Sequence, residues 1–242
     1  MKIKVLGISG SPRRYGNSQF LLEHALESAK AAAPDLVETE PYTIAGKKFA
    51  GCISCLKCAD LKGECVQKDD FQELRDKWYE ADVVIYSLPV YHMSVPGQVR
   101  CFIDRLGNAT YCYYNMSVPK VMKVIGAIAQ GLHIFSGQEN VMMQIINHAF
   151  LMGCIPVSGD GPECYIGAGG WTSNDFGVGA LKQQTADGQL DATMTLNGAR
   201  SIAKRAVELS LMLKSGADMN RDRLSKDPMY GSFFKRLDAT KA

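Results

Sequence analysis

Four cysteines crowd into one short segment with the spacing Cys-x2-Cys-x2-Cys-x6-Cys: Cys52, Cys55, Cys58 and Cys65. Three thiolates two residues apart can wrap one face of an iron–sulfur cubane, and a fourth on a short turn can reach the remaining iron. Structural zinc sites usually combine two separated Cys-x2-Cys pairs, so this spacing favours iron and sulfide over zinc. A loop of reduced thiols without metal is a further interpretation. The remaining cysteines lack ligand spacing and are expected to be buried thiols: Cys101, Cys112, Cys154 and Cys164.

A second candidate site is the segment 7–18, which is rich in glycine, hydroxyl and arginine side chains. It would join the first strand to the first helix, where free backbone N–H groups and the helix dipole favour a phosphate. The segment has neither the Gly-x-Gly-x-x-Gly of a dinucleotide fold nor a Walker loop, so a phosphomonoester is the better ligand. The alternative is an ordinary turn in which Asn17 or Ser18 caps the helix. The candidate binding residues are Ser9, Ser11, Pro12, Arg13, Gly16, Asn17 and Ser18.

Strand-like and helix-like segments alternate along the chain and must position these residues. Short apolar or β-branched runs predict strands at residues 3–9, 36–43 and 83–88, within 120–129, and at 154–158. Apolar residues at helical spacing predict helices at residues 22–33, 71–81, 95–106, 141–152 and 199–213. This alternation predicts an α/β fold, a doubly wound five-stranded parallel sheet with helices on both faces. Ligands of such sheets bind at the carboxyl ends of the strands.

The predicted elements form a single domain over residues 1–215. A cysteine-rich insertion occupies about residues 46–70. Residues 159–192 contain many glycines and few periodic apolar positions, so we expect a long loop, which in a compact domain is usually functional. We expect residues 216–242 to form a mobile C-terminal tail.

Composition narrows the class of protein. The chain has 242 residues, of which 46% are hydrophobic and 21% are charged, as in ordinary globular domains. Its formal charge of +2 offers no broad footprint for nucleic acid or an anionic membrane. No apolar run approaches the roughly 20 residues of a spanning helix, and the N-terminus lacks a secretory apolar stretch. We therefore expect a cytoplasmic protein that binds neither nucleic acid nor membrane.

Three stretches carry a resemblance to a known family: Gly10-Ser11-Pro12-Arg13 with Gly16-Asn17-Ser18, Ser87-Leu88-Pro89-Val90-Tyr91, and Phe102-Ile103-Asp104-Arg105. They resemble the NADPH-dependent FMN reductase group of flavodoxin-like proteins, over about residues 1–158. The resemblance implies the strand order 2-1-3-4-5 and FMN, with its phosphate on the first loop. It also implies that the cysteine motif is that of the iron–sulfur flavoproteins, a branch of this family.

The resemblance further implies which residues border the flavin. The segment after the third strand would lie along the isoalloxazine, and a glycine-rich loop at 126–131, or the looser match at 137–139, would border it from the other side. These implied residues are Pro89, Val90, Tyr91, His92, Ser94, Gly126 and Gly131.

Two residues of this segment, Tyr91 and His92, are candidates for a chemical role. His92 could hydrogen-bond flavin or substrate, or be satisfied by neighbours or water. Tyr91 could form an aromatic wall with Tyr111, Tyr113 and Tyr114, or the latter three could be an interface or a packed loop. No side chain need act as general acid or base, because the flavin carries the chemistry.

Together these features predict an FMN-dependent oxidoreductase whose 4Fe-4S cluster serves as a one-electron port. It would transfer electrons between NAD(P)H or ferredoxin and a small acceptor. The alternatives are a flavin electron carrier without its own substrate, a plain NAD(P)H:FMN or quinone reductase without a cluster, and a zinc-stabilised binding module. The resemblance also implies sites completed by a neighbouring subunit, hence a homo-oligomer, a dimer or tetramer.

Overall fold

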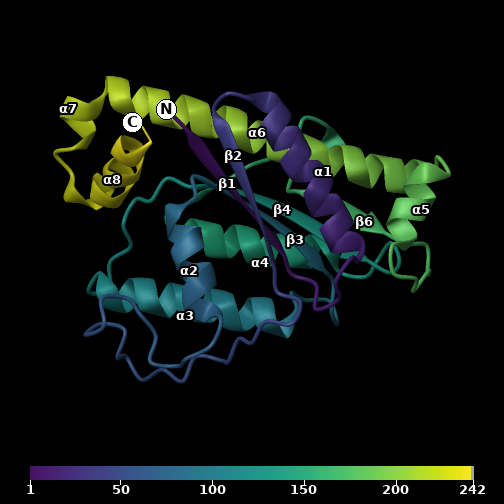
Figure 1. The fold of residues 1–242 in the computed structure, drawn as a ribbon, viewed down its shortest axis with the longest axis horizontal. Coiled ribbons are helices and arrows are strands. Elements are labelled where there is room, and N and C mark those ends of the chain that lie inside the picture. Colours follow the sequence, from purple (N-terminus) through teal and green to yellow (C-terminus); the bar gives the residue numbers. More distant parts are fainter. Residues whose placement is uncertain (241–242) are drawn as a thin grey trace.

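A six-stranded parallel sheet forms the centre of the computed structural model, which describes residues 1–240 (Figure 1). Five strands follow the order β2-β1-β3-β4-β5, and the sixth, β6, also pairs with β4. The strands are β1 (Ile3–Ser9), β2 (Val37–Thr43), β3 (Val83–Pro89), β4 (Val124–Gly131), β5 (Ile155–Pro156) and β6 (Ala168–Trp171). The predicted flavodoxin-like order 2-1-3-4-5 is therefore confirmed.

Helices cover both faces of the sheet, as predicted. The longer ones are α1 (Asn17–Ala32), α2 (Phe71–Glu80), α3 (Gly97–Tyr113), α4 (Gln138–Leu151) and α6 (Leu190–Met219). One buried apolar cluster joins the sheet to α1 and α6, and a second joins it to α2, α3 and α4. Successive residues of β1 alternate between them, because Val5 belongs to the first and Leu6 to the second.

The segment 159–192 differs from the predicted loop. It contains a short 3-10 helix η1 (Pro162–Cys164), strand β6 and helix α5 (Ala180–Ala186), and α6 already begins at Leu190. Residues 168–171 of β6 pair with 128–131 of β4, beyond the point where the two-residue β5 ends. A Cβ at Gly170 would lie 2.2 Å from Thr195 Cγ2, so the glycines of β6 let α6 pack closely.

The C-terminal segment is folded, which corrects the prediction of a mobile tail. Helix α6 continues to Met219, followed by α7 (Arg221–Leu224), a 3-10 helix η2 (Pro228–Tyr230) and α8 (Gly231–Ala239). Asp82, at the start of β3, accepts hydrogen bonds from Lys214 Nζ and Arg236 Nε, both at 2.8 Å. Phe233, Phe234 and Leu237 of α8 are buried, so the segment packs against the domain; residues 241 and 242 lie outside the described part.

Within residues 1–240, no helix combines the length and the apolar character needed to cross a bilayer.

Candidate functional site

The loop between β1 and α1 has the geometry of an anion site. Gly10 N donates to Ser87 O at 2.9 Å, and Arg13 N donates to the Ser11 hydroxyl at 3.2 Å, which holds the loop against β3. Ser11, Gly16, Asn17 and Ser18 are buried, whereas Pro12 and Arg13 are exposed. Helix α1 begins without a side-chain cap, so the alternative of an ordinary turn capped by Asn17 or Ser18 is not observed.

Two serine hydroxyls in this region are buried without a hydrogen-bond partner in the described residues. Ser9 is 0% exposed and Ser18 is 2% exposed, and neither Oγ has a partner within residues 1–240. A buried hydroxyl without a partner costs about 1–3 kcal/mol, which few residues in a folded protein sustain without reason. Because the first N–H groups of α1 also need acceptors, a phosphate at this helix N-terminus would satisfy both sets of donors.

Helix α5 closes over the same loop through Asn17. The side-chain oxygen Oδ1 of Asn17 accepts a hydrogen bond from Leu181 N, in the first turn of α5, at 3.1 Å. Leu181 itself is fully buried against the α1 side of the sheet. The segment predicted as a long loop thus contacts the loop between β1 and α1. The two residues are 164 positions apart, so their spacing alone does not predict this contact.

The loop after β3 is a tight turn at the same edge of the sheet. Tyr91 and Ser94 exchange both backbone hydrogen bonds at 3.0 Å, and the two residues between them have positive φ, 47° at His92 and 64° at Met93. This is the backbone of a two-residue primed turn. Pro89 is buried, Val90 is half-buried, and Val90 N donates to Gln130 O at 2.8 Å, joining the turn to the end of β4.

The side chains of this turn differ in their exposure and hydrogen bonding. Tyr91 and His92 are exposed and free to face a ligand above the turn. The Ser94 hydroxyl, in contrast, donates to Gln144 Oε1 on α4 at 3.0 Å, so it anchors the turn to that helix. Ser94 thus positions the turn, while Tyr91 and His92 remain candidates for contact with the flavin.

The loop after β4 borders the turn from the other side. The Ser136 hydroxyl accepts hydrogen bonds from Leu132 N at 3.1 Å and His133 N at 2.9 Å. A Cβ at Gly131 would lie 2.5 Å from Ser136 Cβ, and one at Gly137 would lie 2.8 Å from Met93 Cα. Gly131 lets the loop fold closely on its own Ser136, and Gly137 lets it approach the turn at Met93, so the bordering loop lies at about residues 131–138.

Gly126 does not belong to that loop, which corrects its prediction as a flavin neighbour. It lies inside β4, and a Cβ there would meet Ile202 of α6 at 2.6 Å and Ile85 of β3 at 2.7 Å. The glycine allows helix and sheet to pack closely. It is buried beneath α6, in the interior of the strand and short of its carboxyl end.

The predicted aromatic wall is also absent from the described residues. Helix α3 extends to Tyr113, beyond the predicted end, so Tyr111 and Tyr113 are helical. Tyr91 precedes the start of α3, and a 17-residue helix is about 25 Å long, so Tyr113 lies at the far end. There the rings of Tyr113 and Tyr114 contact each other with centroids 4.8 Å apart. The alternative of a packed loop does not describe them either, because Tyr111 and Tyr113 are helical and Tyr113 is exposed; an interface stays a prediction.

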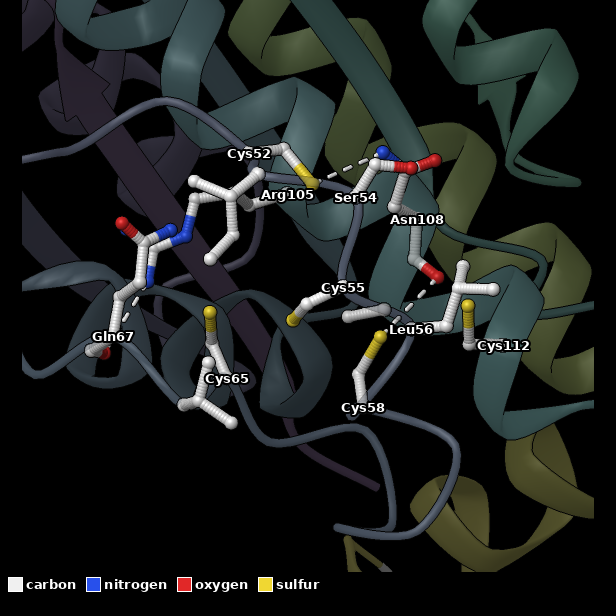
Figure 2. Close-up of a pocket in the computed structure, with 13 residues that line it drawn as sticks. Cys52, Ser54, Cys55, Leu56, Cys58, Cys65, Gln67, Arg105, Asn108 and Cys112 are labelled. Atoms are coloured by element: carbon white, nitrogen blue, oxygen red, sulfur yellow. Dashed lines mark hydrogen bonds between the residues drawn. The ribbon is translucent and has the colours of Figure 1, made fainter.

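The four clustered cysteines line one apolar cavity (Figure 2). Cys52 and Cys55 are exposed, Cys58 and Cys65 are half-buried, and all lie on the irregular loop between β2 and α2. The cavity is small, about 30 Å³. In residues 1–240 no three Cys, His, Asp or Glu side chains are close enough to hold a metal ion. Four thiols are the donors that an iron–sulfur cluster uses, but in the arrangement described for residues 1–240 they are not gathered into a metal site.

Helix α3 supplies the opposite wall of this cavity, which sequence reasoning missed. Asn108 Nδ2 donates to Cys52 Sγ at 3.3 Å, and Cys112 faces the cavity beside Cys58 (Figure 2). Burial, and then the neighbouring Cys112 thiol, raise the pKa of Cys58 to about 11. Arg105, Asn108 and Cys112 are spaced three and four residues apart, which places them on one helix face and was a usable signal.

Arg105 fastens the cysteine loop to α3. It is 2% exposed, and its Nη1 donates to Asp69 Oδ2 at 2.6 Å and to Ala50 O at 3.3 Å. Burial alone would raise the pKa of Asp69, but the hydrogen bonds from Arg105 and the backbone hold it below its usual range. Since Ala50 precedes the four cysteines and Asp69 follows them, one side chain ties both ends of the loop.

The other predicted buried thiols divide into two groups. Cys154 and Cys164 are buried, as expected, and burial raises the pKa of Cys154 to about 12. Cys101 is only half-buried. Cys112 is also half-buried and lines the cysteine cavity, so the prediction of a buried thiol is wrong for Cys101 and Cys112.

Comparison with known proteins agrees with this arrangement. The sequence profile described as NADPH-dependent FMN reductase matches residues 3–161. An iron-sulfur flavoprotein of Methanocaldococcus jannaschii is 32% identical over 212 residues, covering 88% of this chain and all of the relative. An iron-sulfur flavoprotein of Archaeoglobus fulgidus is 36% identical over 168 residues, covering 69% of this chain and 82% of the relative.

Solved structures share the fold at low sequence identity. An azoreductase from Bacillus anthracis aligns with a TM-score of 0.56 at 15% identity, covering 84% of this chain and 99% of that one. A WrbA-like flavodoxin from Agrobacterium tumefaciens aligns with a TM-score of 0.53 at 15% identity, covering 88% and 99%.

Proposed function

Because the chain belongs to the NADPH-dependent FMN reductase family and is a flavin-dependent oxidoreductase, we propose that residues 9–18 hold the phosphate of FMN. The observation that carries this assignment is the pair of buried serine hydroxyls without partners, Ser9 and Ser18, beside the N-terminus of α1. The flavin ring would then lie between the turn at 89–94 and the loop at 131–138, with Gly131 on its border.

FMN, when bound, supplies transfer of a hydride or of single electrons. The chain contributes binding and orientation. The serine hydroxyls and the N–H groups at the start of α1 would donate to the phosphate, and Arg13 on the exposed rim of the loop would add positive charge. The turn at 91–94, fixed to α4 through Ser94, would hold one side of the ring. This proposal assigns no general acid or base.

We further propose that Cys52, Cys55, Cys58 and Cys65 hold a 4Fe-4S cluster. Three observations support it: the four thiols line one cavity, Asn108 donates toward one of the sulfurs, and several relatives carry the name iron-sulfur flavoprotein. A cluster supplies one-electron transfer, and thiolates are its usual protein ligands. The irregular, largely exposed course of residues 52–65 leaves the loop room to open around it.

The proposed reaction transfers electrons between NAD(P)H or ferredoxin and a small acceptor. A cluster at the surface suits a one-electron protein donor such as ferredoxin, because Cys52 and Cys55 are exposed. We also propose that the protein works in the cytoplasm, where cluster thiols remain reduced.

A homo-oligomer, dimer or tetramer, is part of the same proposal. Phe150 and Leu151 at the end of α4 are 65% and 55% exposed, and Met143 on the same helix is 38% exposed. A two-fold axis would let this helix face its own copy. Light scattering at micromolar concentration should therefore give at least twice the 26.5 kDa chain mass, and a monomer would contradict the proposal.

The experiment that tests the function is the visible spectrum of anaerobically purified protein with iron and acid-labile sulfide analysis. We expect flavin bands and four irons per chain, after reconstitution where needed. Full flavin occupancy without iron would make the protein a plain NAD(P)H:FMN or quinone reductase. Failure to oxidise NAD(P)H with any small acceptor would favour the electron carrier.

A further inference from the structure

A cavity of about 510 Å³ opens at the carboxyl ends of β4 and β6, apart from the cysteine cavity. Three aromatic side chains line it, Phe135, Tyr165 and Trp171, of which Phe135 is 81% exposed and Tyr165 is 61% exposed. Exposed aromatic side chains around a concave space of this size are typical of small-molecule sites, which range over about 300–1,000 Å³.

Three glycines line this cavity along β6 and the residue before it, and close packing requires two of them, Gly167 and Gly170. Gly167 has a φ of +140°, and a Cβ there would lie 2.4 Å from Ala127 O. Gly169 and Gly170 follow in β6, so three of the four residues at 167–170 carry no side chain. The floor is therefore backbone, and the aromatic rings stand around it.

The cavity adjoins the loops assigned to the flavin. Met93 and Gly137 both line it, and these are the residues at which the β3 turn and the β4 loop approach each other. Asn140 Nδ2, on the first turn of α4, donates to Met93 O and fixes that corner. None of residues 9–18 lines the cavity, so it does not include the loop proposed to hold the phosphate.

The charged side chains that line the cavity are all negative. Glu139 and Glu163 are its only charged residues, and the described lining includes no Lys, Arg or His. Both glutamates are exposed at the rim. Anions such as the phosphates of a dinucleotide would meet like charge here, whereas a cation or a neutral ring would not.

We propose that this cavity binds an aromatic small molecule that is neutral or positively charged. The aromatic side chains would stack on or edge against its ring, and the two carboxylates would select against negative charge. That this molecule is the substrate that exchanges electrons with the flavin rests on the proposed function. That the cavity binds such a molecule does not.

Calorimetric titration of the FMN-loaded protein tests the proposal with three probes that share one bicyclic ring. They are N-methylquinolinium (positive), quinoline (neutral) and quinoline-6-carboxylate (negative). We expect the first two to bind and the carboxylate to bind about tenfold more weakly, since exposed carboxylates contribute modest energies each. Glu139→Gln with Glu163→Gln should bring the three dissociation constants within about threefold of one another.

Aromatic variants test the other half of the proposal. Phe135→Ala with Tyr165→Ala should weaken binding of the neutral probe about tenfold, while Phe176→Ala, an equally exposed phenylalanine outside the cavity, should leave it unchanged. Circular dichroism and FMN content of each variant check its folding, and Tyr165→Leu is the milder alternative if the double variant unfolds.

Three outcomes would overturn the proposal: no binding of the neutral probe at millimolar concentration, equal affinity for the cationic and anionic probes, or release of FMN by a probe. The last would make the cavity part of the flavin site. Absence of FMN from the purified protein would instead refute the proposed function, so the two failures are distinguishable.

Discussion

Replacing Ser18 with alanine should stabilise the apoprotein and weaken FMN binding at the same time. The hydroxyl is 2% exposed and has no hydrogen-bond partner within residues 1–240, so its removal should raise the free energy of unfolding of the apoprotein by about 1 kcal/mol. If the hydroxyl donates to a phosphate, the same change removes a charge-assisted hydrogen bond of about 1.5–3 kcal/mol. The dissociation constant of FMN should therefore rise about 10- to 100-fold.

A nearby serine provides the matched control. Ser87 is equally buried, but its hydroxyl donates to Ser18 O at 2.8 Å. Ser87→Ala should therefore lower apoprotein stability by about 1 kcal/mol and leave FMN affinity within about threefold of wild type. Urea unfolding of the apoproteins and fluorescence titration with FMN measure both quantities for each variant.

A ligand-binding hydroxyl differs from a structural one in the effect of its removal. Removing a ligand-binding hydroxyl raises apoprotein stability and lowers FMN affinity, whereas removing a structural one lowers stability alone. If Ser18→Ala destabilised the apoprotein and FMN bound with unchanged affinity, the hydroxyl would be part of the packing. The assignment of the phosphate to this loop would then be wrong.

Three further predictions concern the cysteine cavity and one buried histidine. Cys55→Ser should remove most iron while FMN stays bound, and Cys101→Ser should do neither; iron and flavin analysis measures both, and equal iron in the two variants would contradict the ligand assignment. Asn108→Ala should make the midpoint potential of the cluster more negative in a redox titration, because an N–H donor to the sulfur of Cys52 stabilises the reduced state; an unchanged potential would exclude this role. Burial lowers the pKa of His148 to about 4 from 6.5, so the unfolded chain binds the proton first and stability falls as pH drops from 6.5 towards 4. His148→Asn should remove about 3 kcal/mol of this loss in the free energy of unfolding. Urea unfolding at pH 7.5 and 4.5 measures it; an equal fall in unfolding free energy for wild type and variant would contradict the prediction.

The sheet was predictable because its strands carry strong local signals. Val83–Leu88 is apolar except for Ser87, and the loop after β1 has glycine and hydroxyl residues at a strand-to-helix junction. Strand β6 has no such signal, since Ala168 and two glycines lack β propensity. At Gly170, the close approach of Thr195 leaves no room for a side chain. Tertiary packing, and not local propensity, determines that these residues form a strand.

For the C-terminal helices, the sequence could predict the helix but not the residues that it packs against. Phe233, Phe234 and Leu237 have helical spacing, so α8 could have been recognised from the sequence. What spacing does not reveal is its partner: Asp82 is paired with Lys214 and Arg236, which are 132 and 154 residues away. The same holds for Cys112, whose relation to the cysteine motif depends on how α3 packs against the loop.

The hydrogen bond from Leu181 N to Asn17 Oδ1 connects the two proposed ligand sites through one stretch of chain. At one end of residues 171–181, Trp171 lines the aromatic cavity, and at the other end α5 is fastened to the phosphate loop. If a molecule in the cavity ordered this stretch, the order would extend through the Leu181 N–Asn17 Oδ1 hydrogen bond to the loop at residues 9–18. By thermodynamic linkage, the factor by which FMN changes affinity for that molecule equals the factor by which the molecule changes affinity for FMN. With both proposed sites occupied, such coupling would make retention of FMN depend on the occupant of the neighbouring cavity.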